Sequence, residues 1–97
     1  MRIYSRSTLR RFWSKHPDAE QPLRAWFAEA RKAKWERPSD IKALHRSASF
    51  VGDDRVVFNI GGNKYRLVVA VSYRRGSVFV RFVGKHNEYD RIDVAKV

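Results

Sequence analysis

The 97-residue sequence contains no cysteine. This absence excludes disulfide frameworks, thiolate zinc sites and thiol catalysis, and it suits a reducing compartment such as the cytoplasm. The longest apolar run is the five-residue segment Leu67–Val71, far below the ~20 residues that a membrane-spanning helix needs. Residues 1–6 also lack the apolar stretch that follows the charges of a signal peptide. We therefore predict a cytoplasmic protein that does not engage a membrane.

Acidic residues are scarce, with 10 Asp and Glu against 21 Lys and Arg, for a net charge of +11. Fourteen of the cations are arginine, whose planar fork binds phosphate through two donors. This excess predicts a nucleic-acid partner, with an acidic protein partner as the alternative. The few carboxylates lack the spacing of a metal site, and no glycine-rich phosphate loop precedes a helix. The sequence therefore predicts neither a metal nor a cofactor.

The length fits one domain spanning residues 1–97, and Pro38 divides it into a helical half and a strand half. Two stripes at helical spacing predict two amphipathic helices, and they comprise Leu9, Phe12, Trp13 and His16, then Leu23, Trp26, Phe27 and Ala30. We expect Asp18 to cap the second helix, with Gln21 completing a capping box, and that helix to end near Trp35. Residues 39–44 predict a short helix, and residues 45–54 a loop.

The second half alternates apolar and polar residues over 55–60, 64–73 and 78–85, which is typical of strands with one buried face. Turn residues at 61–63 and 74–77 separate these runs. Together with the helices they predict an α+β fold. Two N-terminal helices pack on a small antiparallel sheet, a three-strand meander with a possible short extra strand.

The two turns also predict the strand register. A type II′ turn at Gly62-Asn63 pairs Ile60 with Tyr65, and an even-length second loop pairs Tyr73 with Val78 and Val71 with Val80. The same register places three polar residues in one row across the other face of the sheet, namely Asn59, Arg66 and Lys85. His86 is the next residue after Lys85. This row is the candidate site.

The row suits the cleavage of RNA, because RNA carries its own nucleophile, the 2′-hydroxyl beside each phosphate. Arg66 is placed to stabilise the charge on the transferring phosphate, and His86 to act as general base or acid. A helical turn after His86 would bring Tyr89 and Asp90 to its side. Tyr89 would then donate a proton or stack on a base, and Asp90 would orient the imidazole. The alternative is that Tyr89 closes the core and Asp90 caps a turn.

The remaining aromatic and histidine residues predict packing more than chemistry. Trp13, Trp26 and Trp35 belong to the predicted core. His16 and His45 are expected at a helix end and in a loop. Phe79 lies on the basic face, where it either stacks on a nucleobase or packs beneath a loop.

Residues 57–67 and 81–90, VFNIGGNKYRL and RFVGKHNEYD, resemble the signature blocks of HigB-type toxins, and the resemblance extends nearly end to end. These are RelE-like mRNA interferases of bacterial type II toxin–antitoxin systems. The resemblance implies a RelE-like fold whose helix-free face is active, cleavage of mRNA on the translating ribosome, and neutralisation by a HigA-type helix-turn-helix antitoxin. The residues that match the family's polar positions are Asn59, Arg66, His86 and Tyr89. Lys85 departs from the threonine common in the family.

The sequence thus predicts an endoribonuclease that inhibits translation by metal-independent attack of the 2′-hydroxyl. We expect three catalytic residues, Arg66, His86 and Tyr89. The expected RNA-binding residues are Asn59, Asn63, Lys64, Arg81 and Lys85. A non-catalytic RNA-binding module and a module for an acidic protein partner remain the alternatives.

Overall fold

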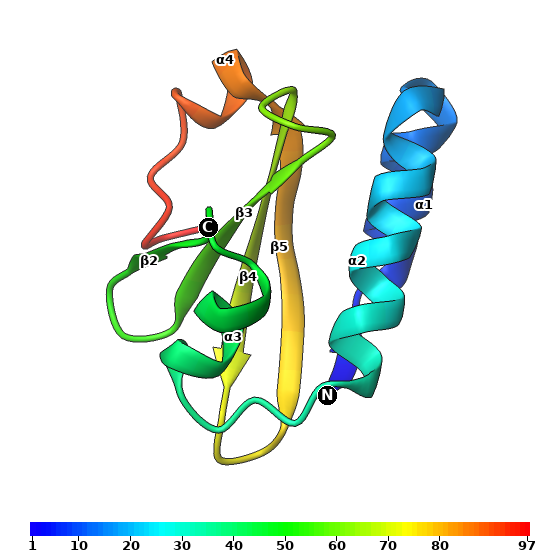
Figure 1. Ribbon diagram of the computed structural model, residues 1–97. Helices are drawn as coiled ribbons and strands as arrows, with labels where there is room; N and C mark the ends of the chain where they lie inside the picture. The colour runs from blue at the N-terminus through cyan, green and yellow to red at the C-terminus, as the bar shows by residue number, and fades with distance from the viewer.

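The computed structural model describes residues 1–97 and shows the two long N-terminal helices together on one side of a curved sheet (Figure 1). In chain order the elements are β1 (Arg2–Tyr4), α1 (Arg6–Lys15), a 3₁₀ turn (Pro17–Ala19), α2 (Glu20–Lys32), α3 (Pro38–Leu44), β2 (Ser49–Val51), β3 (Arg55–Ile60), β4 (Tyr65–Ser72), β5 (Ser77–Lys85) and α4 (His86–Tyr89). None of the helices combines the length and apolar character needed to cross a bilayer. The predicted α+β class is confirmed.

The sheet has five strands in the order β1-β5-β4-β3-β2. Its centre is the predicted antiparallel meander of β3, β4 and β5. The loop predicted over residues 45–54 is wrong at β2, which pairs with β3 through Phe50 and Val56. At the other edge β1 runs parallel to β5, with Tyr4 opposite Phe79. Both added strands have three residues, too few for an alternating pattern to identify, and both depend on pairing with a longer neighbour.

The core lies between the sheet and the layer formed by α1 and α2 (Figure 1). It comprises 17 buried residues, among which Leu9, Leu23 and Trp26 come from the two predicted helical stripes. The second helix ends at Lys32, earlier than predicted, but Trp35 is still buried against Phe58. The helical stripes were therefore predicted correctly, and the C-terminal boundary of α2 was not.

Asp18 does not cap α2. Ala19 occupies the N-cap position, and no side chain caps the helix. The Asp18 carboxylate instead pairs with Lys64 and accepts a hydrogen bond of 2.5 Å from the Tyr65 hydroxyl. These bonds, from Lys64 first and Tyr65 second, lower the pKa of Asp18. The predicted cap thus connects the helical layer to the start of β4.

The register predicted for the first hairpin is confirmed, since Ile60 pairs with Tyr65 and Phe58 with Leu67. Gly62 has a φ of +71°, and the Lys64 N–H donates to the Gly61 carbonyl, as a two-residue turn requires.

The register predicted for the second hairpin is wrong, because Val71 pairs with Val78 and Val69 with Val80. A β-bulge causes a further shift, since Val68 pairs with Phe82 while Arg81 has no partner. One extra residue reverses the alternation of faces beyond it. Val83 therefore packs on the core, and Phe82 shares the opposite face with Val68. The predicted row loses its last member, since Gly84 lies opposite Arg66 and Lys85 lies opposite Tyr65.

The sheet face opposite α1 and α2 is not fully open as we expected. Val57, Val68 and Ala70 are buried there, yet they do not belong to the core beneath the helices. The segment after α4 runs along this side and ends beside β3 (Figure 1), where the Arg55 guanidinium donates to the main-chain oxygen of Val97 at 2.8 and 3.2 Å. The candidate site residues Arg66, His86 and Tyr89 lie away from the point where this C-terminal segment ends, at the end of the sheet that carries α4 and the β3–β4 turn (Figure 1).

Candidate active site and nucleic-acid interface

Arg66 is the second residue of β4, directly after the β3–β4 turn, and it points away from the helical layer. Its Nη1 donates to the carbonyls of Asn63 and Tyr65 at 3.3 and 3.4 Å. The guanidinium carbon lies 6.0 Å from the centre of the Tyr89 ring, at the limit of a cation–π contact. Because Tyr89 belongs to α4, two of the predicted site residues, Arg66 and Tyr89, come together across the end of the sheet.

α4 follows β5 without a loop, and it starts where the Lys85 N–H donates to Glu88 Oε1 at 2.8 Å. His86 opens this helix, and its Nδ1 lies 3.1 Å from Asp90 Oδ2. The His86 and Asp90 side chains are 54% and 58% exposed, so substrate can reach them. A carboxylate at Nδ1 fixes the ring and its tautomer and leaves Nε2 free for proton transfer. Of the two roles that the sequence left open for Asp90, this contact fits the one beside the His86 imidazole.

Gly84, the register partner of Arg66, has no side chain, and the Phe82 ring occupies the space that a side chain there would take. A Cβ at Gly84 would lie 2.6 Å from Phe82 Cζ and 3.2 Å from Glu88 Oε1. The Phe82 ring therefore covers Gly84 on the face that also carries Arg66. Sequence reasoning missed Phe82 because the bulge at Arg81 is invisible in an alternating pattern. The one available signal was Gly84, since a glycine inside a strand pattern often marks a bulge or a close approach of another group.

The five predicted RNA-binding residues separate into three places. Asn63 and Asn59 lie near Arg66, since Asn63 supplies a carbonyl to it and Asn59 is its partner across the β3–β4 ladder. Lys85 is exposed beside His86 but is outside the predicted row.

Arg81 and Lys64 lie apart from that group. The guanidinium carbon of Arg81, at the bulge, is 5.6 Å from the centre of the Phe79 ring. Lys64 is paired with Asp18 of the helical layer. The structure therefore groups only Asn63 and Asn59 with Arg66, whereas Lys85 lies opposite Tyr65, which faces the helical layer.

His45 lies in the loop after α3, as expected, and its ring is half-buried against the core. Its ring lies 5.0 Å from Phe58 and 6.1 Å from Trp35, and Nε2 is 3.5 Å from a Glu29 carboxylate oxygen. Burial lowers its pKa, and Glu29 only partly opposes this effect. His16 ends α1 against Phe12, as predicted. Neither histidine belongs to the Arg66 site.

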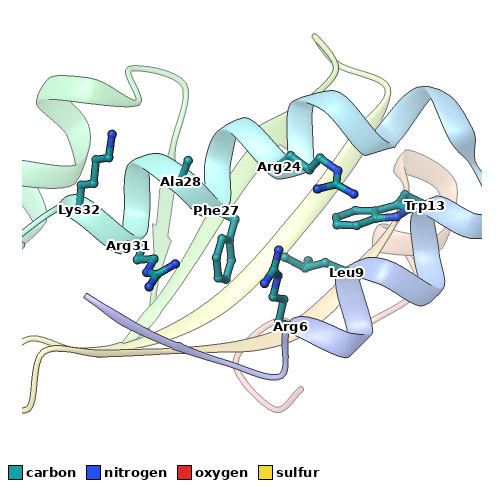
Figure 2. A pocket seen from close by; sticks show the side chains of 8 residues that line it. All are labelled: Arg6, Leu9, Trp13, Arg24, Phe27, Ala28, Arg31 and Lys32. Carbon is teal, nitrogen blue, oxygen red and sulfur yellow. The ribbon is translucent and has the colours of Figure 1, made fainter.

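A second cationic surface lies on the helical layer, on the other side of the sheet from Arg66. A groove of about 480 Å³ lies between α1 and α2. Figure 2 shows Leu9, Trp13 and Phe27, which form its apolar part. Its other lining residues are Ala28 and the four cations Arg6, Arg24, Arg31 and Lys32. Arg6 lies 4.5 Å from the Phe27 ring centre and Arg24 lies 4.9 Å from that of Trp13.

Comparison with known proteins identifies the class to which this fold and site belong. A family model described as the RelE-like toxic component of a toxin–antitoxin system matches residues 19–92, from the end of the 3₁₀ turn to just beyond α4. The matched region contains β3, β4, β5 and the Arg66 site. The chain belongs to this family, the HigB toxins.

Curated relatives carry the same family name. The mRNA interferase toxin HigB of Escherichia coli K12 is 29% identical over 92 residues, which cover 93% of this chain and 88% of the relative. The proteins named mRNA interferase HigB from Escherichia coli O157:H7 and Shigella flexneri match with the same identity and coverage.

Proposed function

We propose that this toxin is an mRNA interferase that cleaves messages on translating ribosomes in the cytoplasm and is neutralised by a HigA-type antitoxin. Its family and the names of its relatives support the activity. The net charge of +11 supports a polyanionic substrate. The observation that carries the proposal is the meeting of Arg66 with α4, which brings a cation beside a helix holding Tyr89 and the His86–Asp90 pair.

The reaction we propose needs no metal or protein nucleophile. The 2′-oxygen of one nucleotide attacks the adjacent phosphorus, and the bond from phosphorus to the 5′-oxygen of the next nucleotide breaks. One group removes the 2′-proton, another protonates the leaving oxygen, and His86 performs one of these transfers. Asp90 holds the imidazole ring through Nδ1. The products are a cyclic phosphate and a 5′-hydroxyl.

Arg66 stabilises the additional negative charge of the transition state. Its guanidinium is permanently charged and is rooted on a central strand, so little reorganisation is needed as charge develops. The contact with Tyr89 and the two carbonyl hydrogen bonds restrict the guanidinium. Tyr89 and Asn59 position the RNA strand around the scissile phosphate in this proposal.

The test compares Arg66→Ala with Arg74→Ala, which removes an exposed arginine from the β4–β5 turn at the opposite end of the sheet. Loss of one transition-state donor lowers the rate by roughly 10²- to 10³-fold. Primer extension on a translated message should therefore show cleavage products fading for Arg66→Ala and unchanged for Arg74→Ala. Undiminished cleavage by Arg66→Ala would contradict the assignment. Intact RNA with wild-type protein, despite salt-sensitive binding, would favour the non-catalytic binding module.

The groove between α1 and α2 supports the partner in this proposal. An apolar floor edged by four cations complements an acidic amphipathic segment of the antitoxin, and the groove lies away from Arg66. Arg31→Glu should weaken co-purification of toxin with antitoxin, whereas Arg46→Glu, at an exposed residue between α3 and β2, should not. Equal loss for both variants would indicate non-specific charge attraction. Full retention by Arg31→Glu would place the antitoxin elsewhere.

A further inference from the structure

The β1 edge of the sheet carries an aromatic pair outside the Arg66 site, in which Tyr4 is exposed and Phe79 is half-buried. Tyr4 of β1 and Phe79 of β5 are register partners, and their rings stack with centroids 4.7 Å apart and planes 11° apart. Tyr4 is 38% exposed. Since β1 is the edge strand, Phe79 is the neighbour of Tyr4 within the sheet on one side, and no strand lies on the other. With no strand beyond β1 and more than a third of Tyr4 exposed, part of the Tyr4 ring is accessible to a third planar group.

Two arginines accompany this pair. Arg2 Nη1 lies 3.5 Å from the Tyr4 hydroxyl, and the guanidinium carbon of Arg81 lies 5.6 Å from the centre of the Phe79 ring. Neither Arg2 nor Arg81 pairs with a carboxylate, whereas Arg24 and Arg55 both do. Both side chains are therefore free to bind anions. Arg81 stands at the bulge, where its backbone has no partner on β4.

The aromatic pair lies on the sheet face that carries Arg66. Phe79 pairs with Ala70, which is four residues along β4 from Arg66 and points to the same side. At ~3.3 Å per residue the separation along the strand is about 13 Å. The C-terminal segment ends beside β3, on the other side of β4 from this pair (Figure 1). A strand of RNA leaving the Arg66 site toward the β1 edge would therefore meet the aromatic pair.

We propose that Tyr4, Phe79, Arg2 and Arg81 form a binding site for single-stranded RNA outside the scissile position. A nucleobase stacks on the exposed Tyr4 ring, and the two arginines contact phosphates. Aromatic rings on a sheet combined with arginine are the general means of holding single strands, and they tolerate any base sequence. This inference rests on the proposed function, and it defines how a strand is held beyond the reacting phosphate.

The test measures RNA affinity in an Arg66→Ala parent that does not cleave. Tyr4→Leu and Phe79→Leu are made in this parent, and binding of a fluorescein-labelled single-stranded oligoadenylate is followed by anisotropy. Loss of one base–aromatic stack corresponds to a decrease in affinity of roughly 5- to 100-fold. Tyr4→Phe keeps the ring and should bind as the parent does. Phe50→Leu, which changes an aromatic residue of β2 that is 39% exposed at the opposite edge, should also bind normally.

An arginine variant covers the case in which the aromatic variants fail to fold. Arg81→Gln alters an exposed side chain and should reduce the slope of log affinity against log salt by about 0.7, the value for one phosphate contact on a single strand. Arg10→Gln, at an exposed residue of α1, should leave the slope unchanged. If folded Tyr4→Leu binds like Phe50→Leu, or if Arg81→Gln keeps the parental slope, the inference is overturned.

Wild-type cleavage of a translated message separates this inference from the proposed function. If the wild type does not cleave but Tyr4→Leu still loses RNA affinity, the binding site stands and the nuclease falls. If the wild type cleaves and Tyr4→Leu binds normally, the proposed nuclease stands and the proposed binding site is refuted. If every variant binds RNA as tightly as the parent, RNA is not the ligand of this edge, and an acidic protein is the ligand instead.

Discussion

Gly84→Ala is expected to disturb the Arg66 site through its packing. The new Cβ would lie 2.6 Å from Phe82 Cζ and 3.2 Å from Glu88 Oε1, whereas ordinary contact starts at 3.4 Å. The Phe82 ring must therefore move by close to an ångström. Gly84 has no positive φ, so any effect comes from crowding and not from backbone strain.

The size of the effect follows from what can move. Overpacking a well-filled site destabilises by about 1–3 kcal/mol, and the lower end applies here because the half-exposed Phe82 ring can turn outward. A loss of about 1 kcal/mol lowers the melting temperature of a domain of this size by roughly 4–8 °C. The Glu88 carboxylate also accepts the Lys85 N–H that starts α4, so crowding it displaces the helix carrying His86 and Tyr89. Cleavage should therefore fall in variants that remain folded.

The assay is a double-mutant cycle of Gly84→Ala and Phe82→Leu, with urea unfolding and message cleavage as readouts. Phe82→Leu removes the ring atoms that the new Cβ would meet, so adding Gly84→Ala to it should cost less than adding it to wild type. Equal costs in the two backgrounds would refute the reasoning, as would a Gly84→Ala protein with wild-type stability and cleavage.

Two further predictions concern the core. Leu67→Ala empties a fully buried site on β4 and should destabilise by about 2–5 kcal/mol in urea unfolding, whereas Leu44→Ala, at 56% exposure, should stay within about 0.5 kcal/mol; similar losses for both would contradict the assigned core. Burial lowers the pKa of His45, so as pH falls the unfolded chain binds a proton at His45 before the folded protein does. The stability that neutral His45 contributes is therefore complete above about pH 6.5 and is lost below it. His45→Phe should flatten the pH dependence of unfolding between pH 7 and pH 5, measured against wild type; an unchanged slope would show that His45 does not titrate against burial.

Sequence reasoning worked best where one local rule covered a whole element. The helical stripes of α1 and α2 and the turn at Gly62 each follow from periodicity or turn chemistry within a few residues. The contact of His86 with Asp90 has the i, i+4 spacing of a helical turn, but the sequence left open whether Asp90 would instead cap a turn. Reasoning failed at Asp18, whose carboxylate was close enough in sequence to cap α2 but found Tyr65 and Lys64 instead. A local capping pattern cannot compete with a partner nearly fifty residues away that only the fold supplies.

The amino-acid sequence by itself predicted the fold class, the two amphipathic helices, the three-strand meander, the cationic character and the candidate residues Arg66, His86 and Tyr89, whereas β1 before Pro38 and α3 starting at Pro38 show that the predicted division into a helical and a strand half was too simple. Periodicity, charge and residue chemistry are written along the chain and need no third dimension. Tertiary structure alone decided which residues meet. The bulge at Arg81 moved Lys85 out of the row and Phe82 into the site, and the parallel pairing of β1 placed Tyr4 on Phe79. The bulge and the pairing of β1 depend on contacts between distant strands. A one-residue shift there exchanges the two faces of the sheet, yet it leaves almost no trace in the local sequence pattern.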